Sequence, residues 1–216
     1  MVNDNLQRKP LVIIGGGGHA SVIVDILKRQ KREIVAIISP DDITQRKVYS
    51  GIDVFSNDNE IFRFQPKDIR LINGIGALPD SEVRYKVNLY FEKMGYCFET
   101  IVADNAYVSP FAFLEEGVQI FPGAIIQPGT HIGAHTIINT RVVIEHDVSL
   151  GAYNAISPGA IICGQCKTEE RVFIGAGAIV IQNIEIGSRA TIMANALVAE
   201  NIHPQQKVYA SRGIVR

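Results

Sequence analysis

Aliphatic residues recur at every sixth position through the second half of the chain. The series runs in one register from Val108 to Val198, and Thr168 is its one polar member. A small or β-branched residue stands two positions before nearly every member, the clear exception being Asn154 before Ile156. A six-residue period fits neither a 3.6-residue helix nor a single alternating strand; it is the hexapeptide pattern of a parallel β-helix.

The hexads also predict which side chains face inward. Residues two apart, such as Val142 and Ile144, point to the same side of a strand, and the residue between them points outward. Three hexads close one triangular coil, so we expect about five stacked coils with a narrow aliphatic interior. An ordinary β-sandwich has no reason to keep one register over this length.

Apolar runs and helical patterns alternate in the first hundred residues, which is typical of a small Rossmann-like parallel sheet. The predicted strands are Leu11–Ile14, Ile34–Ile38 and residues 69–72, with helical patterns after the first strand and between Glu82 and Met94. Charged residues are concentrated in this half, whereas Gly, Ala and Ile dominate the hexads. We therefore expect an α/β domain at residues 1–100, followed by an all-β domain, the β-helix, at residues 101–216.

A glycine-rich turn follows the first predicted strand. Residues 15–18 are all glycine, His19 follows, and a helix starting at Ala20 or Ser21 would offer free backbone N–H groups to a phosphate. Such a turn binds a nucleotide or simply makes a tight connection. The second strand ends at Ser39 rather than at the acidic residue that holds the ribose in NAD-type sites, which argues against a dehydrogenase.

Composition narrows the class of partner. A formal net charge of −1 and a pI near 6.5 provide no basic surface for nucleic acid or an anionic membrane. Residues 1–10 lack an apolar signal core, and no apolar run approaches the ~20 residues of a membrane span, so we expect a cytoplasmic protein. The cysteines form one C-x-x-C, at Cys163 and Cys166, without a second pair, so we expect structural thiols and no metal.

His146 is the histidine with adjacent acidic partners. Because Ile144 and Val148 face inward, His146 lies at a corner of the prism, between Glu145 and Asp147. A histidine beside carboxylates suits a general base, and a solvated turn residue is the alternative.

Several motifs together resemble the nucleotide-sugar acetyltransferases of the left-handed β-helix class, which include bacillosamine-pathway N-acetyltransferases and sialic acid O-acetyltransferases. The resemblance covers nearly the whole chain. Its motifs are Ile13-Ile14-Gly15-Gly16-Gly17-Gly18-His19, Asn73-Gly74-Ile75-Gly76 with Arg84, Ile138-Asn139-Thr140, Ile144-Glu145-His146-Asp147 and Phe173-Ile174-Gly175-Ala176-Gly177-Ala178.

The resemblance implies a left-handed coil and a homotrimer with acetyl-CoA bound between neighbouring prisms. It implies that His146 is the general base, that Asp147 strengthens it as a base, and that Asn139 lies close by. It further implies that the nucleotide-sugar is held by Gly17, Gly18, His19 and Gly76, and that the acetyl-CoA groove is lined by Gly175, Ala176 and Ala194. The sequence departs from many relatives at Ala155, where they carry a second histidine, and at residues 210–213, where they carry Gly-x-Pro-Ala.

The expected function is acetyl-CoA-dependent N-acetylation of the 4-amino group of a UDP-linked 4-amino-4,6-dideoxy sugar, in the biosynthesis of surface glycans or glycoprotein sugars. A sialic acid O-acetyltransferase would use the same base on a hydroxyl group. A non-catalytic nucleotide-sugar-binding scaffold is a third alternative, although a scaffold has no need of Asn139 or of a basic corner.

Overall fold

A computed structural model of the 216-residue chain describes residues 8–43 and 45–211. The chain divides into two compact units. The first contains the described residues up to Gly76 and the segment Glu82–Glu99, and the second contains Ala77–Ser81 and the described residues from Thr100 onward. The chain thus leaves the first unit briefly before its last helix, an excursion that the hydrophobic pattern does not reveal.

The first unit is a parallel sheet with strand order β3-β2-β1-β4. Its elements are β1 (Leu11–Ile14), α1 (Gly18–Arg29), β2 (Ile34–Ile38), η1 (Lys47–Tyr49), β3 (Val54–Phe55), η2 (Asp58–Arg63), β4 (Arg70–Asn73) and α2 (Val83–Lys93). The uninterrupted apolar sequence of β1 fits its central position, because a strand buried on both faces needs no polar alternation. The two-residue strand β3 is too short to produce a detectable period.

One boundary differs from its expected position in a way that affects the candidate site. Helix α1 begins at Gly18, before the expected start at Ala20 or Ser21, and Gly17 is its N-cap with extended backbone. The glycine turn therefore runs directly into the helix, and Gly18 and His19 belong to the first helical turn.

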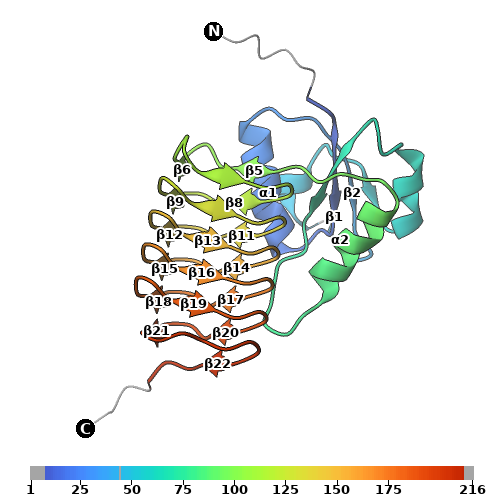
Figure 1. The fold of residues 1–216 in the computed structure, drawn as a ribbon. Helices are drawn as coiled ribbons and strands as arrows, with labels where there is room; N and C mark the ends of the chain where they lie inside the picture. The colour runs from blue at the N-terminus through green and yellow to red at the C-terminus, as the bar shows by residue number, and fades with distance from the viewer. Residues whose placement is uncertain (1–7, 44, 212–216) are drawn as a thin grey trace. The chain divides into compact units, whose positions relative to one another are not determined.

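The second unit is a stack of short strands in three parallel sheets, which we call its first, second and third faces (Figure 1). The first face contains β5 (Ile101–Val102), β8 (Gln119–Ile120), β11 (Ile137–Ile138), β14 (Ala155–Ile156), β17 (Phe173–Ile174), β20 (Thr191–Ile192) and β22 (Lys207–Val208). The second face contains β6 (Tyr107–Val108), β9 (Ile125–Ile126), β12 (Val143–Ile144), β15 (Ile161–Ile162), β18 (Ile179–Val180) and β21 (Leu197–Val198). The third face contains β7 (Phe113–Leu114), β10 (His131–Ile132), β13 (Ser149–Leu150), β16 (Lys167–Thr168) and β19 (Glu185–Ile186).

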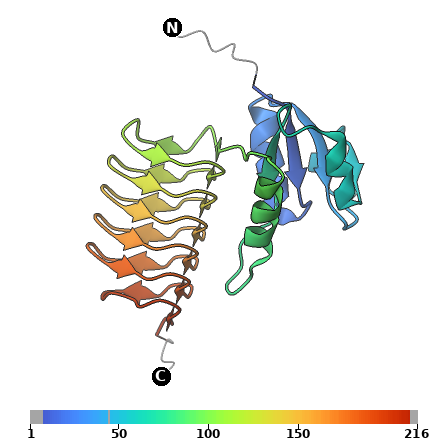
Figure 2. The same cartoon turned by 45° about the vertical axis from the view of Figure 1, so that its right-hand side comes forward.

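Strand pairing confirms the hexad register. Ile144 pairs with Ile126 in the preceding coil and with Ile162 in the following coil, and all three side chains are fully buried. Figure 2 shows the coils stacked one above another. The arrangement is the predicted parallel β-helix, and it is consistent with the left-handed form. The stack begins one strand earlier than the predicted series, because Val102 of β5 pairs with Ile120.

The corners of the prism share one backbone conformation. From Gly117 to Asn195, every sixth residue has a positive φ, including non-glycine residues such as Arg141 (φ 57°) and Asp147 (φ 60°). A left-handed residue turns the chain sharply between faces, and Asn and Asp tolerate this conformation better than most side chains. Asp147 therefore occupies a required turn position as well as standing next to His146.

The two exceptions to the hexad pattern are hydrogen-bonded to each other. Asn154 and Thr168 both point into the prism, and Asn154 Nδ2 donates to Thr168 Oγ1 over 2.8 Å. Asn154 Nδ2 also donates to the Gly151 carbonyl, and Asn154 Oδ1 accepts from Val172 N. Each buried polar group thus has partners, which removes the penalty that would otherwise disfavour it in an aliphatic core.

Candidate active site

His146 and Asp147 form a hydrogen-bonded pair at the corner between the second and third faces, the His146 corner. Imidazole Nδ1 lies 2.9 Å from Asp147 Oδ2, and each side chain is 59% exposed. Glu145, on the other side, makes no hydrogen bond to the imidazole in the described part of the chain. Of the two neighbouring carboxylates, only that of Asp147 contacts the imidazole.

This contact selects one form of the neutral imidazole. A carboxylate only accepts hydrogen bonds, so Nδ1 carries the proton and Nε2 keeps its lone pair. Within the described residues, no protein group hydrogen-bonds to Nε2, and the ring is largely exposed. The arrangement leaves Nε2 able to accept a proton from a bound molecule.

A second group of candidate residues lies at the corner between the first and second faces, the Asn139 corner. Asn139 and Gly175 occupy equivalent turn positions two coils apart, and Ala176 and Ala194 occupy the next turn position in two successive coils. A Cβ on Gly175 would lie 2.7 Å from the Met193 carbonyl carbon and closer still to Ala194 N, so only glycine allows these coils to stack. The Asn139 amide Nδ2 donates to the Ile156 carbonyl.

One chain does not bring the two groups together. Strand β12 lies between Asn139 and His146, so the two residues stand at opposite edges of the second face, and the strand with its flanking residues spans roughly 10–15 Å. Asn139 is therefore beyond hydrogen-bond reach of His146 in the same chain. Ala155, where many relatives carry a second histidine, lies in β14 on the first face and is also away from the His146 corner.

The glycines after β1 fall into two kinds. Cβ atoms on Gly15 and Gly16 would lie 2.8 Å from Ile75 Cγ1 and 2.7 Å from Ile43 Cγ2, so these two glycines are required for packing. Gly74 is similarly enclosed. A Cβ on Gly17 or Gly18 would meet no atom within 4 Å, and neither residue has a positive φ. The exposed approach to the turn is therefore at Gly17 and Gly18.

His19 and Gly76 are neighbours in space, as a shared binding role requires. A Cβ on Gly76 would lie 3.4 Å from His19 Cβ, so the loop after β4 passes directly against this histidine. The loop is held by Asn73, whose Oδ1 accepts from Ile75 N, and by Arg84, which donates to the carbonyls of Asn73 and Ile75. Arg84, quoted in the family motif, thus stabilises the loop that carries Gly76.

Two residues that lie near the start of α1 in space, Arg46 and Tyr49, belong to no motif that would have predicted this position from the sequence. Arg46 Nη1 donates to Ser21 Oγ over 3.1 Å, which places an exposed positive charge beside the first turn of the helix. Tyr49 Oη donates to the carbonyls of Gly16 and Gly17 over 2.9 Å. The first turn of α1 contains no acidic residue, so the helix dipole and Arg46 together favour an anion here.

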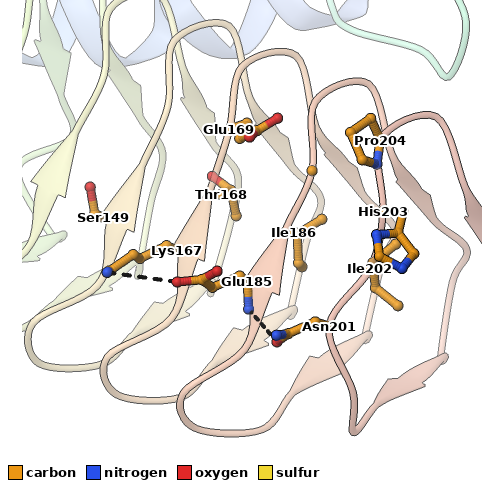
Figure 3. Close-up of a pocket in the computed structure, with 11 residues that line it drawn as sticks. Ser149, Lys167, Thr168, Glu169, Glu185, Ile186, Asn201, Ile202, His203 and Pro204 are labelled. Atoms are coloured by element: carbon orange, nitrogen blue, oxygen red, sulfur yellow. Dashed lines mark hydrogen bonds and ion pairs between the residues drawn. The ribbon is translucent and has the colours of Figure 1, made fainter.

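A hollow of about 520 Å³ lies on the third face near the C-terminal end of the β-helix (Figure 3). The last coil is shortened there, since Ile186 bridges to Ile202 instead of to a residue eighteen positions on. Lys167 and Glu185 form an exposed ion pair across its floor. None of the residues expected to bind substrate or catalyse lines this hollow.

Other features of the described residues bear less directly on the site. The Cys166 thiol donates to the Ile181 carbonyl, and burial raises the pKa of this thiol, as expected of a structural cysteine.

No group of three His, Cys, Asp or Glu side chains in residues 8–43 and 45–211 could hold a metal ion. No helix in that part of the chain is long and apolar enough to cross a membrane. In the unusual segment 210–213, Arg212 and Gly213 lie outside the described residues.

Comparison with known proteins defines the class. Residues 10–88 match the family described as the PglD N-terminal domain. The GDP-perosamine N-acetyltransferase of Escherichia coli O157:H7 is 28% identical over 165 residues, which are 74% of this chain and 73% of that protein.

Solved structures extend the similarity to both units. The perosamine N-acetyltransferase of Caulobacter crescentus, solved as a histidine-to-asparagine mutant with CoA and GDP-perosamine, is 31% identical, covers 92% of each chain and has a TM-score of 0.82. The acetyltransferase domain of PglB from Neisseria gonorrhoeae FA1090, in complex with acetyl coenzyme A, is 26% identical over 93% of this chain and 95% of that chain, with a TM-score of 0.82.

The chain therefore belongs to the hexapeptide-type nucleotide-sugar N-acetyltransferases. It is an acetyltransferase that uses acetyl-CoA, which confirms the class of enzyme predicted from the sequence.

Proposed function

We propose that the protein transfers the acetyl group of acetyl-CoA to the 4-amino group of a nucleotide-linked 4-amino-4,6-dideoxy sugar, with His146 as general base. The observation that carries the proposal is the exposed His146–Asp147 pair, in which Nε2 is free to accept a proton. A cytoplasmic location, predicted from the sequence, suits a reaction that consumes acetyl-CoA and a nucleotide sugar.

The chemistry requires one proton transfer. The neutral amine attacks the thioester carbonyl, a C–N bond forms, and the C–S bond to CoA breaks. Nε2 of His146 takes the proton that the nitrogen loses and can return it to the departing CoA sulfur, so the products are an amide and free CoA. The Asp147 carboxylate holds Nδ1 and stabilises the imidazolium that forms in between.

The identity of the nucleotide is the finer part of the proposal. The sequence resemblance predicts UDP, whereas two relatives carry GDP-perosamine in their names or complexes, which favours GDP as the second candidate. Release of CoA thiol should be followed with UDP- and GDP-linked forms of the same 4-amino sugar, and with a sialic acid. Turnover only with sialic acid would favour O-acetylation, and no turnover with any acceptor would favour a scaffold.

We propose that the complete active site forms between chains. Asn139, Gly175, Ala176 and Ala194 line one edge of the second face, and His146 lines its other edge. The outward side chains of this face form an apolar column that is exposed except for the half-buried Val143: Tyr107, Ile125, Val143, Ile161, Ile179 and Leu197. Such a column marks an interaction surface, and a second copy of the chain on it could bring its own corner to the first chain's His146. Closure of this contact around three chains is the homotrimer implied by the family resemblance.

Replacement of Ile179 by glutamate should dissociate the assembly, because it places a charge in the apolar column. Light scattering should show the mass falling toward the monomer value of 23.7 kDa, with a parallel loss of activity. Ser149→Glu, on the polar third face, is the matched control and should leave the mass unchanged. Full activity in a monomeric variant would exclude a site shared between chains.

Mixed assemblies test the shared site directly. His146→Ala and Asn139→Ala chains should each be impaired alone, and co-expression of the two should restore part of the activity, since some interfaces then combine an intact His146 with an intact Asn139. Absence of any restoration in verified mixed assemblies would mean that both residues act within one chain.

A bulky residue at Gly18 should weaken binding of the nucleotide-sugar. The fold has room for a side chain there, so the variant should fold normally while the new side chain blocks close approach of the ligand to the helix N-terminus. Gly18→Leu should raise the KM for the sugar by about tenfold or more and leave the KM for acetyl-CoA nearly unchanged. Gly16→Ala, where packing is tight, should instead lower the melting temperature. An equal rise in both KM values for Gly18→Leu would contradict a sugar-binding role.

A further inference from the structure

The His146 imidazole lies directly over Gly164 of the next coil. A Cβ on Gly164 would come within 2.7 Å of both Cε1 and Nε2 of the ring. Real side chains do not approach this closely, so any residue other than glycine at this position would push against the edge of the ring that carries the free nitrogen. Because Gly164 has no side chain, the imidazole and its Nε2 can occupy this position over the next coil.

The backbone does not explain this glycine. Gly164 has no positive φ, so alanine could adopt its conformation without strain. The equivalent turn position is occupied by other residues in all the neighbouring hexads: Glu116, Pro122, Pro128, Ala134, Thr140, His146, Ala152, Pro158, Glu170, Ala176, Gln182, Ser188 and Ala194. Gly164 is the one glycine of this series, and it is the one that His146 covers.

Gly129 occupies the corresponding place on the other side of the pair, in the preceding coil. A Cβ on Gly129 would lie 3.3 Å from Asp147 Cγ and closer still to Oδ1. Gly129 also has a positive φ of 75°, but this conformation is shared by corner residues that are not glycine. The two glycines thus leave space for the imidazole on one side and for the carboxylate on the other.

We propose that Gly164 and Gly129 are positioning residues for the catalytic pair: the coils on either side of it lack the side chains that would displace the imidazole and the carboxylate. The proposal rests on the proposed role of His146 as general base. Neither glycine need touch the substrate. Each acts by keeping Nδ1 on Asp147 and Nε2 directed toward the acceptor, and displacement of a base by about 1 Å can cost about 10²-fold in rate.

The first test is Gly164→Ala. Because His146 is largely exposed, its ring can turn away, so the melting temperature should stay within about 2 °C of the parent value. We expect kcat to fall by about 10- to 100-fold, with both KM values within about twofold. Added to His146→Ala, the same change should have no further effect on kcat. Unchanged kcat in Gly164→Ala, or an equal loss with and without His146, would overturn the proposal.

A spectroscopic arm separates this proposal from the general-base mechanism. With ¹⁵N-labelled histidine, the parent protein should show His146 protonated at Nδ1, and Gly164→Ala should shift the signal toward a mixture of both tautomers as the bond to Asp147 is lost. An unchanged imidazole spectrum would overturn the positioning role whatever the turnover. If His146→Ala kept full activity while Gly164→Ala still changed the His146 signal, the general-base mechanism would be refuted and the positioning of the ring would remain supported.

Gly129→Ala has a matched control in Gly159→Ala. Both positions have similar positive φ values, 75° and 70°, but a Cβ on Gly159 would meet no atom within 4 Å. The two variants should therefore lose similar stability through backbone strain, and Gly129→Ala should lose about tenfold more kcat because it also displaces the carboxylate. Equal kcat in the two variants would show that strain alone accounts for the effect and would overturn the role of Gly129.

Discussion

Replacement of His146 by alanine should lower kcat by about 10²- to 10⁴-fold, the usual contribution of a general base. The imidazole accepts the proton that the sugar amine loses, and the methyl group of alanine cannot accept a proton. The variant should fold and assemble normally, because the ring is 59% exposed at a corner and fills no part of the core. Measurement is by CoA thiol release at saturating concentrations of both substrates.

Asp147→Asn is the matched companion to this change. Asparagine tolerates the left-handed backbone of this position and can still accept a hydrogen bond from Nδ1, but it lacks the charge that stabilises the imidazolium. We therefore expect a smaller loss of kcat than for His146→Ala. Near-complete activity of His146→Ala on the true acceptor would refute the mechanism and leave His146 as a solvated turn residue.

Replacement of Ile144 by aspartate should destabilise the β-helix by about 3–5 kcal/mol. Ile144 is fully buried between Ile126 and Ile162, so the carboxylate would have no water and no partner. In a chain of this length, a loss of that size should lower the melting temperature by about 10 °C or more, which calorimetry can measure.

Two controls isolate burial as the cause. Ile144→Val keeps an apolar side chain and should cost only about 1 kcal/mol. Ser149→Asp introduces the same carboxylate on the outward side of the next strand, and its effect should be small. A melting temperature for Ile144→Asp equal to that of Ser149→Asp would contradict the inward orientation of the hexad residues.

Repetition in the sequence is enough to establish the β-helix, its register and the corner position of His146. Each inward residue stacks on the residue eighteen positions away, so the requirement for an apolar side chain repeats along the chain and can be counted without knowing any long-range contact. The same count could have placed Asn139 and His146 at different corners, because one hexad of separation equals one face of the prism. The resemblance to relatives implies that they lie close together, which the proposed site between two chains would allow.

Only the folded structure shows how the two exceptions to the hexad pattern are accommodated and which glycines are needed for packing or for the candidate site. Asn154 and Thr168 are separate breaks in the sequence pattern, and only the stacking of coils brings their side chains to 2.8 Å. The glycines after β1 cannot be told apart in the sequence, yet the side chain of Ile43 encloses Gly16 and leaves Gly18 open. Ile43 lies in a later loop, so this difference arises only when the loop packs on the turn. Gly164 reveals its role only through the ring that lies over it. Contacts that repeat with the hexad period can be predicted from the sequence alone. Contacts between residues that no period relates depend on how the whole chain folds.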